Sequence, residues 1–126
     1  MRDPNKKSIL IIEDNLDIIE LYTLYFTKAG YEVHTSTDGL MGLVDIMNLK
    51  PSIILLDIMM PQMDGYEVLE SIADHSDLQI PVVIASNLGE NQDKEKALKL
   101  GAKLFITKAD HEAQEIVEMV TGVLEA

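Results

Sequence analysis

The stretch Ile53–Gly65, Ile-Ile-Leu-Leu-Asp-Ile-Met-Met-Pro-Gln-Met-Asp-Gly, decides the fold of this chain. Four apolar residues lead into a single carboxylate, Asp57, and Pro51 and Pro61 flank the run. A short apolar run bounded by turn residues predicts a strand that is buried on both faces. Asp57 then lies at the carboxyl end of a buried strand, where open α/β sheets place ligands and chemistry. Because an unpaired buried charge is unfavourable, Asp57 requires partners from the rest of the chain.

The rest of the chain alternates between apolar runs typical of strands and segments with helical spacing. We expect strands at 8–12, 31–36, 53–56, 81–85 and 103–107, and helices at 15–29, 38–49, 64–75, 89–100 and 111–124. Such alternation indicates a parallel sheet with helices on both faces. Strands one, three and four are continuously apolar and should be central, whereas strands two and five should be edges. With right-handed crossovers, this predicts a flavodoxin-like, doubly wound α/β fold of order 2-1-3-4-5.

Helical spacing also predicts which side chains face the core. In the second helix, the expected inward face consists of Leu40, Leu43, Val44 and Met47. In the last helix, Met119 lies off the expected inward face and is predicted to be exposed.

Length and composition limit the class of protein. A chain of 126 residues fits one domain, 1–126, whose polar segment 1–7 we expect to be flexible. The net charge of -12, with 22 acidic against 10 basic residues, makes direct binding to nucleic acid or an anionic membrane unfavourable. The chain has no cysteine, and its first apolar run, Ile9–Ile12, is too short for a signal peptide. We therefore expect a cytoplasmic protein.

Side chains that can react or bind a metal follow four of the five predicted strands. They are Glu13 and Asp14, Asp57, Ser86, and Lys108. In the order 2-1-3-4-5 these strand ends are adjacent, so the side chains should meet in one cleft. Carboxylates that crowd together raise one another's pKa, and an oxygen-only ligand set suits Mg²⁺. A lysine and a serine hydroxyl opposite suit phosphoryl oxygens, so the set predicts phosphoryl transfer to a carboxylate.

Each of these residues also has an ordinary structural interpretation. Asp14 precedes a helix, where acidic residues are common. Ser86 fits a turn, and Lys108 fits a solvated charge. Asp57 is the least ordinary, because strands are depleted in aspartate. It is the joint occurrence at four strand ends that favours a functional site.

The sequence resembles the receiver domain of two-component response regulators, the family of the chemotaxis response regulator. The resemblance extends over about 8–124. Its motifs are Ile-Glu-Asp-Asn at 12–15, Leu-Leu-Asp-Ile-Met-Met-Pro-Gln-Met-Asp-Gly at 55–65, Pro-Val-Val-Ile-Ala-Ser at 81–86, and Gly-Ala at 101–102 followed by Phe-Ile-Thr-Lys at 105–108.

The resemblance implies that Asp57 accepts a phosphoryl group from a histidine kinase or a phosphotransfer protein. It also implies that Mg²⁺ is bound by Asp14, by Asp57 and by the backbone carbonyl of Met59, with Glu13 acting through a metal-bound water.

The remaining roles that the resemblance implies concern the switch. Ser86 and Lys108 would move onto the phosphoryl oxygens, and Phe105 would be the aromatic residue that turns inward when Ser86 moves. Phe105 is equally well explained as an ordinary strand residue in the unphosphorylated state. The family also implies an output surface on the fourth helix, fifth strand and fifth helix that binds a downstream protein.

The chain departs from the family pattern at three places. Ala109 follows the lysine where proline is usual, so we predict a trans Lys108–Ala109 bond, because a non-proline cis bond costs about 2.5–4 kcal/mol. The residue after Ser86 is Asn87, where the family usually has a small residue. The receivers of winged-helix transcription factors commonly have an acidic pair where this chain has Lys103-Leu104. The absence of that pair puts in doubt whether this chain forms the kind of dimer that those receivers form.

Three other functions compete with this interpretation. A haloacid dehalogenase-type phosphatase would need a second aspartate two residues after the first, where this chain has Met59. A pseudo-receiver would keep the fold as a docking module without phosphorylation. A flavin carrier would need a Ser/Thr-rich phosphate loop after the first strand, which this sequence lacks. We therefore expect a phosphorylation switch, with no turnover on an external substrate and no effector domain in the given sequence.

Overall fold

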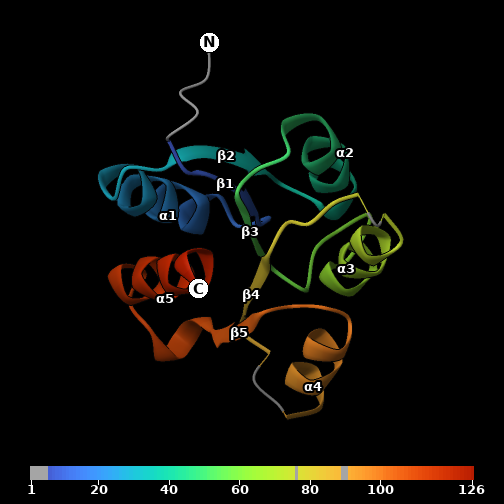
Figure 1. Ribbon diagram of the computed structural model, residues 1–126. Helices are drawn as coiled ribbons and strands as arrows, with labels where there is room; N and C mark the ends of the chain where they lie inside the picture. The colour runs from blue at the N-terminus through green and yellow to red at the C-terminus, as the bar shows by residue number, and fades with distance from the viewer. Residues whose placement is uncertain (1–5, 76, 89–90) are drawn as a thin grey trace.

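The computed structural model describes residues 6–75, 77–88 and 91–126, and it has the predicted architecture. Five parallel strands lie in the order β2-β1-β3-β4-β5 (Figure 1). The strands are β1 (Ser8–Ile12), β2 (Glu32–Ser36), β3 (Ile53–Leu56), β4 (Val82–Ser86) and β5 (Leu104–Thr107). The helices are α1 (Leu16–Lys28), α2 (Gly39–Leu49), α3 (Gly65–Ala73), α4 (Asn91–Lys99) and α5 (Ala113–Glu125), with a short 3₁₀ turn at Lys108–Asp110.

The predicted central strands are the buried ones. Every residue of β1, β3 and β4 is buried, whereas β2 and β5 contain half-exposed residues. The register places Ile12 opposite Leu56, and the amide of Asp57 donates to the carbonyl of Ile12 at 3.0 Å. The residues that follow β1 and β3 therefore leave the sheet side by side, which is what brings Glu13 next to Asp57.

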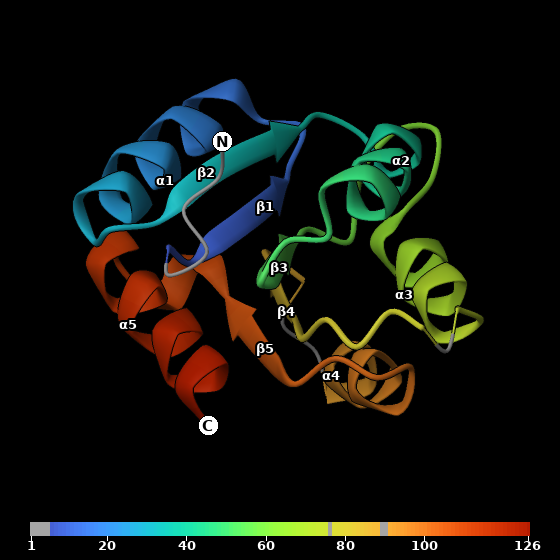
Figure 2. The same cartoon turned by 45° about the horizontal axis from the view of Figure 1, so that its top comes forward.

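The helices cover both faces of the sheet. α1 and α5 lie on one face, and α2, α3 and α4 lie on the other, as Figure 1 and the turned view in Figure 2 show. Polar residues begin three of them: Asn15 and Asp38 accept backbone N–H groups of α1 and α2, and Asp64 forms a capping box with Glu67 at α3. Among the described residues, no helix combines the length and the apolar composition that a membrane span requires.

The predicted inward face of α2 is right only in part: Leu43 is half-buried and Met47 packs against the core, but Leu40 and Val44 do not face inward. Leu40 and Val44 are 51% and 52% exposed, and the buried residues of this helix are Gly39, Gly42 and Ile46. A Cβ at Gly42 would lie 2.7 Å from the Cδ1 atom of Ile12. The helix therefore turns Gly42 toward the sheet and approaches it closely, which hydrophobic periodicity alone does not predict.

Two predictions near the carboxyl end of the chain have different outcomes. The Lys108–Ala109 bond is trans, as predicted, since the described residues contain no cis peptide. Met119 was predicted to be exposed, but it is half-buried and packs against the core between α5 and the sheet. The long, flexible Met side chain reaches the core from the edge of the helix's inward face. Residues 1–5 of the segment expected to be flexible, and residues 89–90 of the predicted fourth helix, lie outside the described residues.

One glycine holds the loop after Asp57 in place. The amide of Gly65 donates to the carbonyl of Ile58 at 2.8 Å, and a Cβ at Gly65 would lie 2.4 Å from the carbonyl oxygen of Asp57. The start of α3 is therefore pressed against the backbone of the strand end, with no room for a side chain.

We predict that Gly65→Ala lowers the free energy of unfolding by roughly 1–3 kcal/mol, because the new methyl group collides with backbone atoms that cannot yield. Gly122→Ala in α5 is the matched control, since nothing lies within 4 Å of its Cβ position. That change should raise stability by about 0.5–1 kcal/mol. Urea unfolding of both variants measures the difference, and equal stabilities would contradict the proposed close contact.

Candidate functional site

The side chains predicted to meet in one cleft do so at the carboxyl ends of β1, β3 and β5. Glu13 is 3% exposed and Asp57 is 8% exposed, although both carry carboxylates. The parallel register brings them together, and Lys108 reaches them from the residue after β5. Such burial of charge requires internal partners.

Lys108 provides the partner for both carboxylates. Its Nζ atom donates to Oε1 of Glu13 and, at 3.2 Å, to Oδ2 of Asp57. The Lys108 side chain is itself only 8% exposed. In so little water, this ammonium interacts far more strongly with the carboxylates than a surface lysine would. The sequence predicted Lys108 beside Asp57, but its contact with Glu13 is visible only in the structure.

Backbone amides bind the other oxygen of each carboxylate. The amide of Ile58 donates to Oδ1 of Asp57 at 2.8 Å, and the amide of Asn15 donates to Oε2 of Glu13 at 3.1 Å. Sequence reasoning missed both donors, because a backbone amide carries no residue-type signal. Together with Lys108, they hold each carboxylate in one orientation.

The electrostatics of the cluster favour an added cation. Burial raises the pKa of the Glu13 carboxyl above its usual value; the hydrogen bond from Lys108 opposes this effect, while the charge of Asp57 adds to it. Burial likewise raises the pKa of the nearby Tyr22 phenol to about 12, and the charges of Glu13 and Asp57 contribute. Three carboxyl groups, those of Glu13, Asp14 and Asp57, thus lie together beside the single ammonium of Lys108.

The donor set fits Mg²⁺. Glu13, Asp14 and Asp57 each offer a carboxylate oxygen, and these three oxygens lie within 4.8 Å of one another. Asp14 is exposed, so the group opens to solvent on its side. A small hard cation that keeps several waters suits such a half-open, oxygen-only group.

The remaining predicted site residues lie around this cluster. Ser86 is 1% exposed at the end of β4, and its Oγ atom accepts the amide of Leu88 at 3.2 Å. Phe105 is half-buried on β5 and packs against the core beneath α3 and α4. Met59 has a side chain exposed to 65%, and its backbone carbonyl as a metal ligand stays a prediction.

An open cavity of about 530 Å³ adjoins the cluster. Its lining comes from the β1–α1 loop, the β3–α3 loop, α3 and the β4–α4 loop. It consists of Asp14, Ile58, Met59, Met60, Pro61, Asp64, Tyr66 and Leu88. The lining is largely apolar apart from the two aspartates and the tyrosine. The cluster is therefore accessible from the Asp14 side.

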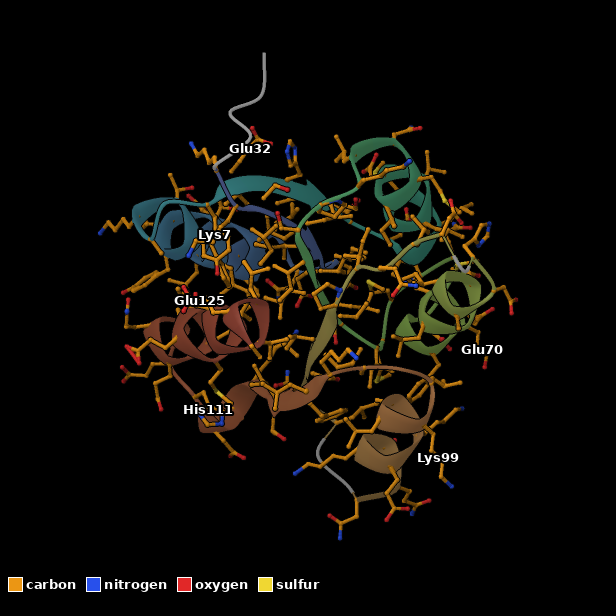
Figure 3. All side chains as sticks on the ribbon, viewed as in Figure 1. Lys7, Glu32, Glu70, Lys99, His111 and Glu125 are labelled. Atoms are coloured by element: carbon orange, nitrogen blue, oxygen red, sulfur yellow. The ribbon has the colours of Figure 1, made fainter. Side chains whose placement is uncertain are left out.

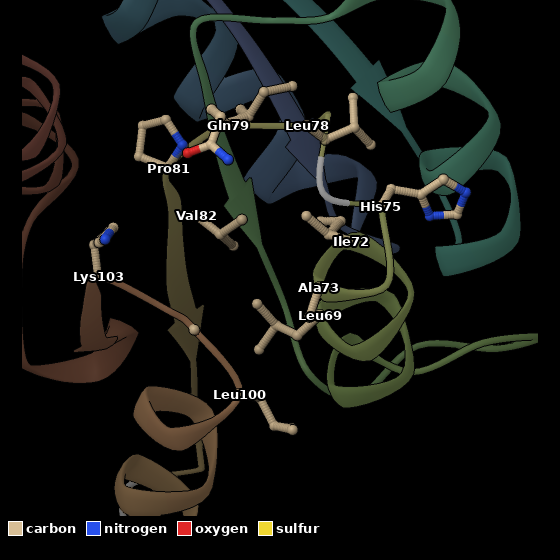
Figure 4. A pocket seen from close by; sticks show the side chains of 12 residues that line it. Leu69, Ile72, Ala73, His75, Leu78, Gln79, Pro81, Val82, Leu100 and Lys103 are labelled. Atoms are coloured by element: carbon tan, nitrogen blue, oxygen red, sulfur yellow. The ribbon is translucent and has the colours of Figure 1, made fainter.

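A second pocket, of about 460 Å³, lies at the other end of the strands, where β4 and β5 begin (Figure 4). Residues near the start of β4 and before β5, including Pro81, Val82 and Lys103, line it together with Leu69 and Ile72 of α3. None of the clustered carboxylates is among its lining residues, so we assign it no part in the chemistry of Asp57.

Comparison with known proteins identifies the family. The profile described as "Response regulator receiver domain" matches residues 9–121. The chain belongs to the response regulator receiver family. The strand order and the position of the acidic cluster agree with this assignment, as the resemblance of the sequence predicted.

Curated relatives of this receiver are transcriptional regulators. It is 34% identical over 117 residues to the "DNA-binding dual master transcriptional regulator RpaA" of Synechocystis, covering 92% of this chain and 48% of that protein. It is 34% identical over 102 residues to the "Alkaline phosphatase synthesis transcriptional regulatory protein PhoP" of Bacillus subtilis, covering 81% of this chain and 42% of that protein. The chain thus spans less than half the length of these relatives.

Solved receivers have the same fold. A chain of the CheX–CheY–BeF3–Mg²⁺ complex of Borrelia burgdorferi superimposes with a TM-score of 0.86 at 30% identity, covering 93% of this chain and 88% of that chain. A CheY-like receiver domain protein of Methanospirillum hungatei gives a TM-score of 0.88 at 25% identity, covering 96% and 95% of the two chains.

We predict that Lys108→Ala lowers the free energy of unfolding by about 3 kcal/mol near neutral pH, because two buried carboxylates lose their shared partner. The loss should shrink as the pH falls toward 4. Without the ammonium, the folded-state pKa of Glu13 rises further, and a raised folded-state pKa adds stability at low pH that disappears as the pH increases. Chemical unfolding across this pH range measures the effect.

The matched control for Lys108→Ala is Lys7→Ala. Lys7 pairs with Glu125 at 3.6 Å on the surface, where both side chains are exposed (Figure 3). Its removal should change stability by less than about 1 kcal/mol at any pH. A Lys108→Ala effect as small as this, or independent of pH, would contradict the assigned pairing.

Proposed function

We propose that this receiver accepts a phosphoryl group on Asp57 from a histidine kinase or a phosphotransfer protein, and so switches its binding to another protein. The supporting observation is the Lys108 ammonium held 3.2 Å from a buried Asp57 carboxylate in a cluster that can hold a divalent cation. Every residue type that the chemistry needs is present at that cluster.

The proposed reaction is an exchange of bonds at phosphorus. An Asp57 carboxylate oxygen attacks the phosphoryl group, a new P–O bond forms, and the P–N bond to the donor imidazole breaks. The ring nitrogen leaves with the electron pair of that bond and takes up a proton. Lys108 and the hydroxyl of Ser86 are the chain's own donors for the phosphoryl oxygens.

Asp14, Asp57 and the Met59 carbonyl would hold Mg²⁺ in this proposal, with Glu13 acting through a water. When bound, the ion neutralises the negative charge that carboxylates and phosphoryl oxygens bring together. The ammonium of Lys108 now bridges Glu13 and Asp57, and arrival of a phosphoryl group gives it a new set of oxygens to bind. The net charge of the cluster would thus change when the ion binds and again when the phosphoryl group arrives.

Two rival functions are less well supported by the site. A haloacid dehalogenase-type phosphatase requires a proton-transferring side chain two residues after the nucleophile, and the thioether of Met59 cannot supply it. A pseudo-receiver would be expected to lack one or more of the residues that phosphorylation requires. We therefore propose a stoichiometric acceptor, located in the cytoplasm, and not an enzyme that turns over an external substrate.

We predict that Asp57→Asn abolishes phosphoryl uptake while the fold is retained, because an amide oxygen is a poor nucleophile. Intact-mass and peptide-mapping spectrometry after incubation with acetyl phosphate and Mg²⁺ would show the modified residue. Asp77→Asn, at an exposed carboxylate far along the chain, is the matched control and should be labelled like the parent. Equal labelling of the Asp57→Asn variant would exclude Asp57 as the acceptor.

The phosphorylated state should be long-lived. Hydrolysis requires a water aligned with the acyl phosphate, and the neighbouring cavity presents the apolar side chains of Met59 and Leu88. Neither can orient a water by hydrogen bonding, so the reactive geometry should be rarely populated.

We predict that Met59→Asn speeds decay of the phosphorylated protein, because the amide can hold the attacking water. Release of inorganic phosphate from protein freed of donor measures the rate. The control is Met41→Asn, which changes a different exposed methionine, one that lies on α2. Its phosphorylated form should decay at the rate of the parent. Unchanged or slower decay of the Met59→Asn variant would count against this explanation.

The output surface should lie on α4, β5 and α5, where Ser86 and Phe105 can report the state of Asp57. The segment 110–126 contributes only acidic charge, from Asp110, Glu112, Glu115, Glu118 and Glu125. As a set, these residues favour a protein partner with a basic or mixed-charge surface and disfavour nucleic acid.

We predict that a Glu115→Lys, Glu118→Lys pair weakens binding of the downstream protein in the phosphorylated state. Pull-downs from native lysate, with and without beryllofluoride, measure it. A Glu70→Lys, Asp74→Lys pair makes the same charge change at the end of α3 and should leave capture unchanged. If beryllofluoride and the α5 pair both have no effect on the captured proteins, the output surface lies elsewhere.

A further inference from the structure

Helix α4 is weakly anchored by apolar burial. Ala97 is the one buried residue between Asn91 and Lys99, and Leu98 is 49% exposed. Burial of apolar side chains supplies most of the stability with which helices dock on a sheet. The position of α4 therefore depends unusually strongly on its polar contacts.

Tyr66 makes such a contact from the first turn of α3. Its hydroxyl donates to Oδ1 of Asp93 at 3.1 Å and lies 3.5 Å from the carbonyl oxygen of the same residue. The ammonium of Lys96 lies 4.2 Å from the centre of the Tyr66 ring, within the range of a cation–π interaction. Two successive turns of α4 thus contact one tyrosine of α3.

The phenol keeps its proton throughout the physiological pH range. Burial raises the pKa of Tyr66 to about 12, and the hydrogen bond to Asp93 contributes to the increase. Tyr66 therefore always acts as the donor in its bond with the Asp93 carboxylate. A hydrogen bond to an ionised acceptor is stronger than a neutral one.

Tyr66 is also fixed relative to Asp57. The preceding residue, Gly65, is bonded to the Ile58 carbonyl at 2.8 Å, and Asp64 caps α3. The Tyr66 side chain lines the cavity that adjoins the acidic cluster. Its contact with Asp93 therefore connects α4 to the loop that carries the phosphoacceptor.

A second contact holds Leu88, three residues before the start of α4. The Ser86 hydroxyl accepts the amide of Leu88 at 3.2 Å. If the Ser86 side chain rotates so that its hydroxyl donates to a phosphoryl group on Asp57, its Oγ atom moves away from the Leu88 amide. That rotation by itself leaves the Tyr66–Asp93 contact in place, so α4 can leave its original position only when this contact also breaks.

We propose that Tyr66 is a positioning residue that, through Asp93, holds α4 in the arrangement of the unphosphorylated receiver and thereby opposes phosphorylation. This inference rests on the proposed function. A contact made in only one of two states shifts the equilibrium between them, and linkage requires that it also alters the affinity of the acid site for the phosphoryl group.

The test uses beryllofluoride with Mg²⁺ as the probe and the full chain as the protein. Tyr66→Phe removes the hydroxyl and keeps the ring beneath Lys96. We expect it to bind beryllofluoride about 5-fold more tightly, the change expected from one net hydrogen bond. Hydrogen exchange of the α4 amides without ligand should become faster. A purely structural tyrosine would lower the melting temperature without increasing this affinity.

Tyr25→Phe is the matched control for this substitution. Tyr25 is a half-buried tyrosine of α1 with the ammonium of Lys28 5.9 Å from the centre of its ring, and it packs on the face of the sheet opposite α4. Its loss of a hydroxyl should leave both the affinity for beryllofluoride and the exchange of α4 unchanged.

Asp93→Ala provides an independent route to the same contact and should reproduce the tighter binding. If one contact is responsible, the Tyr66→Phe, Asp93→Ala double variant should bind about as tightly as either single variant. Additive gains would show that the two residues act separately and would overturn the inference.

The outcomes separate the two proposals. A parent protein that fails to bind beryllofluoride overturns the proposed function. A parent that binds, together with a Tyr66→Phe variant of equal or weaker affinity, overturns the role of Tyr66 alone.

Discussion

The fold is organised around two carboxylates, Glu13 and Asp57, that the sheet places side by side with little access to water. Their mutual repulsion and their burial are both unfavourable, and the ammonium of Lys108 offsets them from the end of a third strand. This interaction requires that β1, β3 and β5 end at the same edge. The parallel sheet, the crossovers and the two helical layers are the means by which one chain brings these ends together.

The same cluster explains how a local reaction can reach a distant surface. In this structure the Lys108 ammonium donates to Glu13, and the Ser86 hydroxyl accepts the amide of Leu88. In the proposed function, a phosphoryl group on Asp57 would compete with these partners for both side chains. Because Leu88 leads toward α4 and Lys108 leads toward α5, the competition acts on two helices of the proposed output surface. α4 has one buried residue, Ala97, fewer than the other four α-helices, so it has the least apolar anchoring of the five.

Much of this architecture is readable from residue types. The continuous apolarity of 9–12, 53–56 and 81–85 indicated the central strands and hence the strand order, because strands covered on both faces carry few polar side chains. The reactive residues were identified from their positions after these strands and, for Lys108, after the fifth strand. Backbone amides contribute equally to orienting Glu13 and Asp57, but they could not be predicted, since every residue except proline has one.

The sequence by itself determined the sheet, its order and the members of the acidic cluster, because these follow from apolarity and from position along the chain. Only the tertiary structure decided which side of each helix faces the sheet and which polar groups form pairs. Periodicity placed Leu40 and Val44 of α2 inward, whereas the close approach at Gly42 turned them outward. The contact of Tyr66 with Asp93 joins residues 27 positions apart, and no local pattern encodes it. Such pairings depend on where packing sets two helices, which is a property of the whole chain.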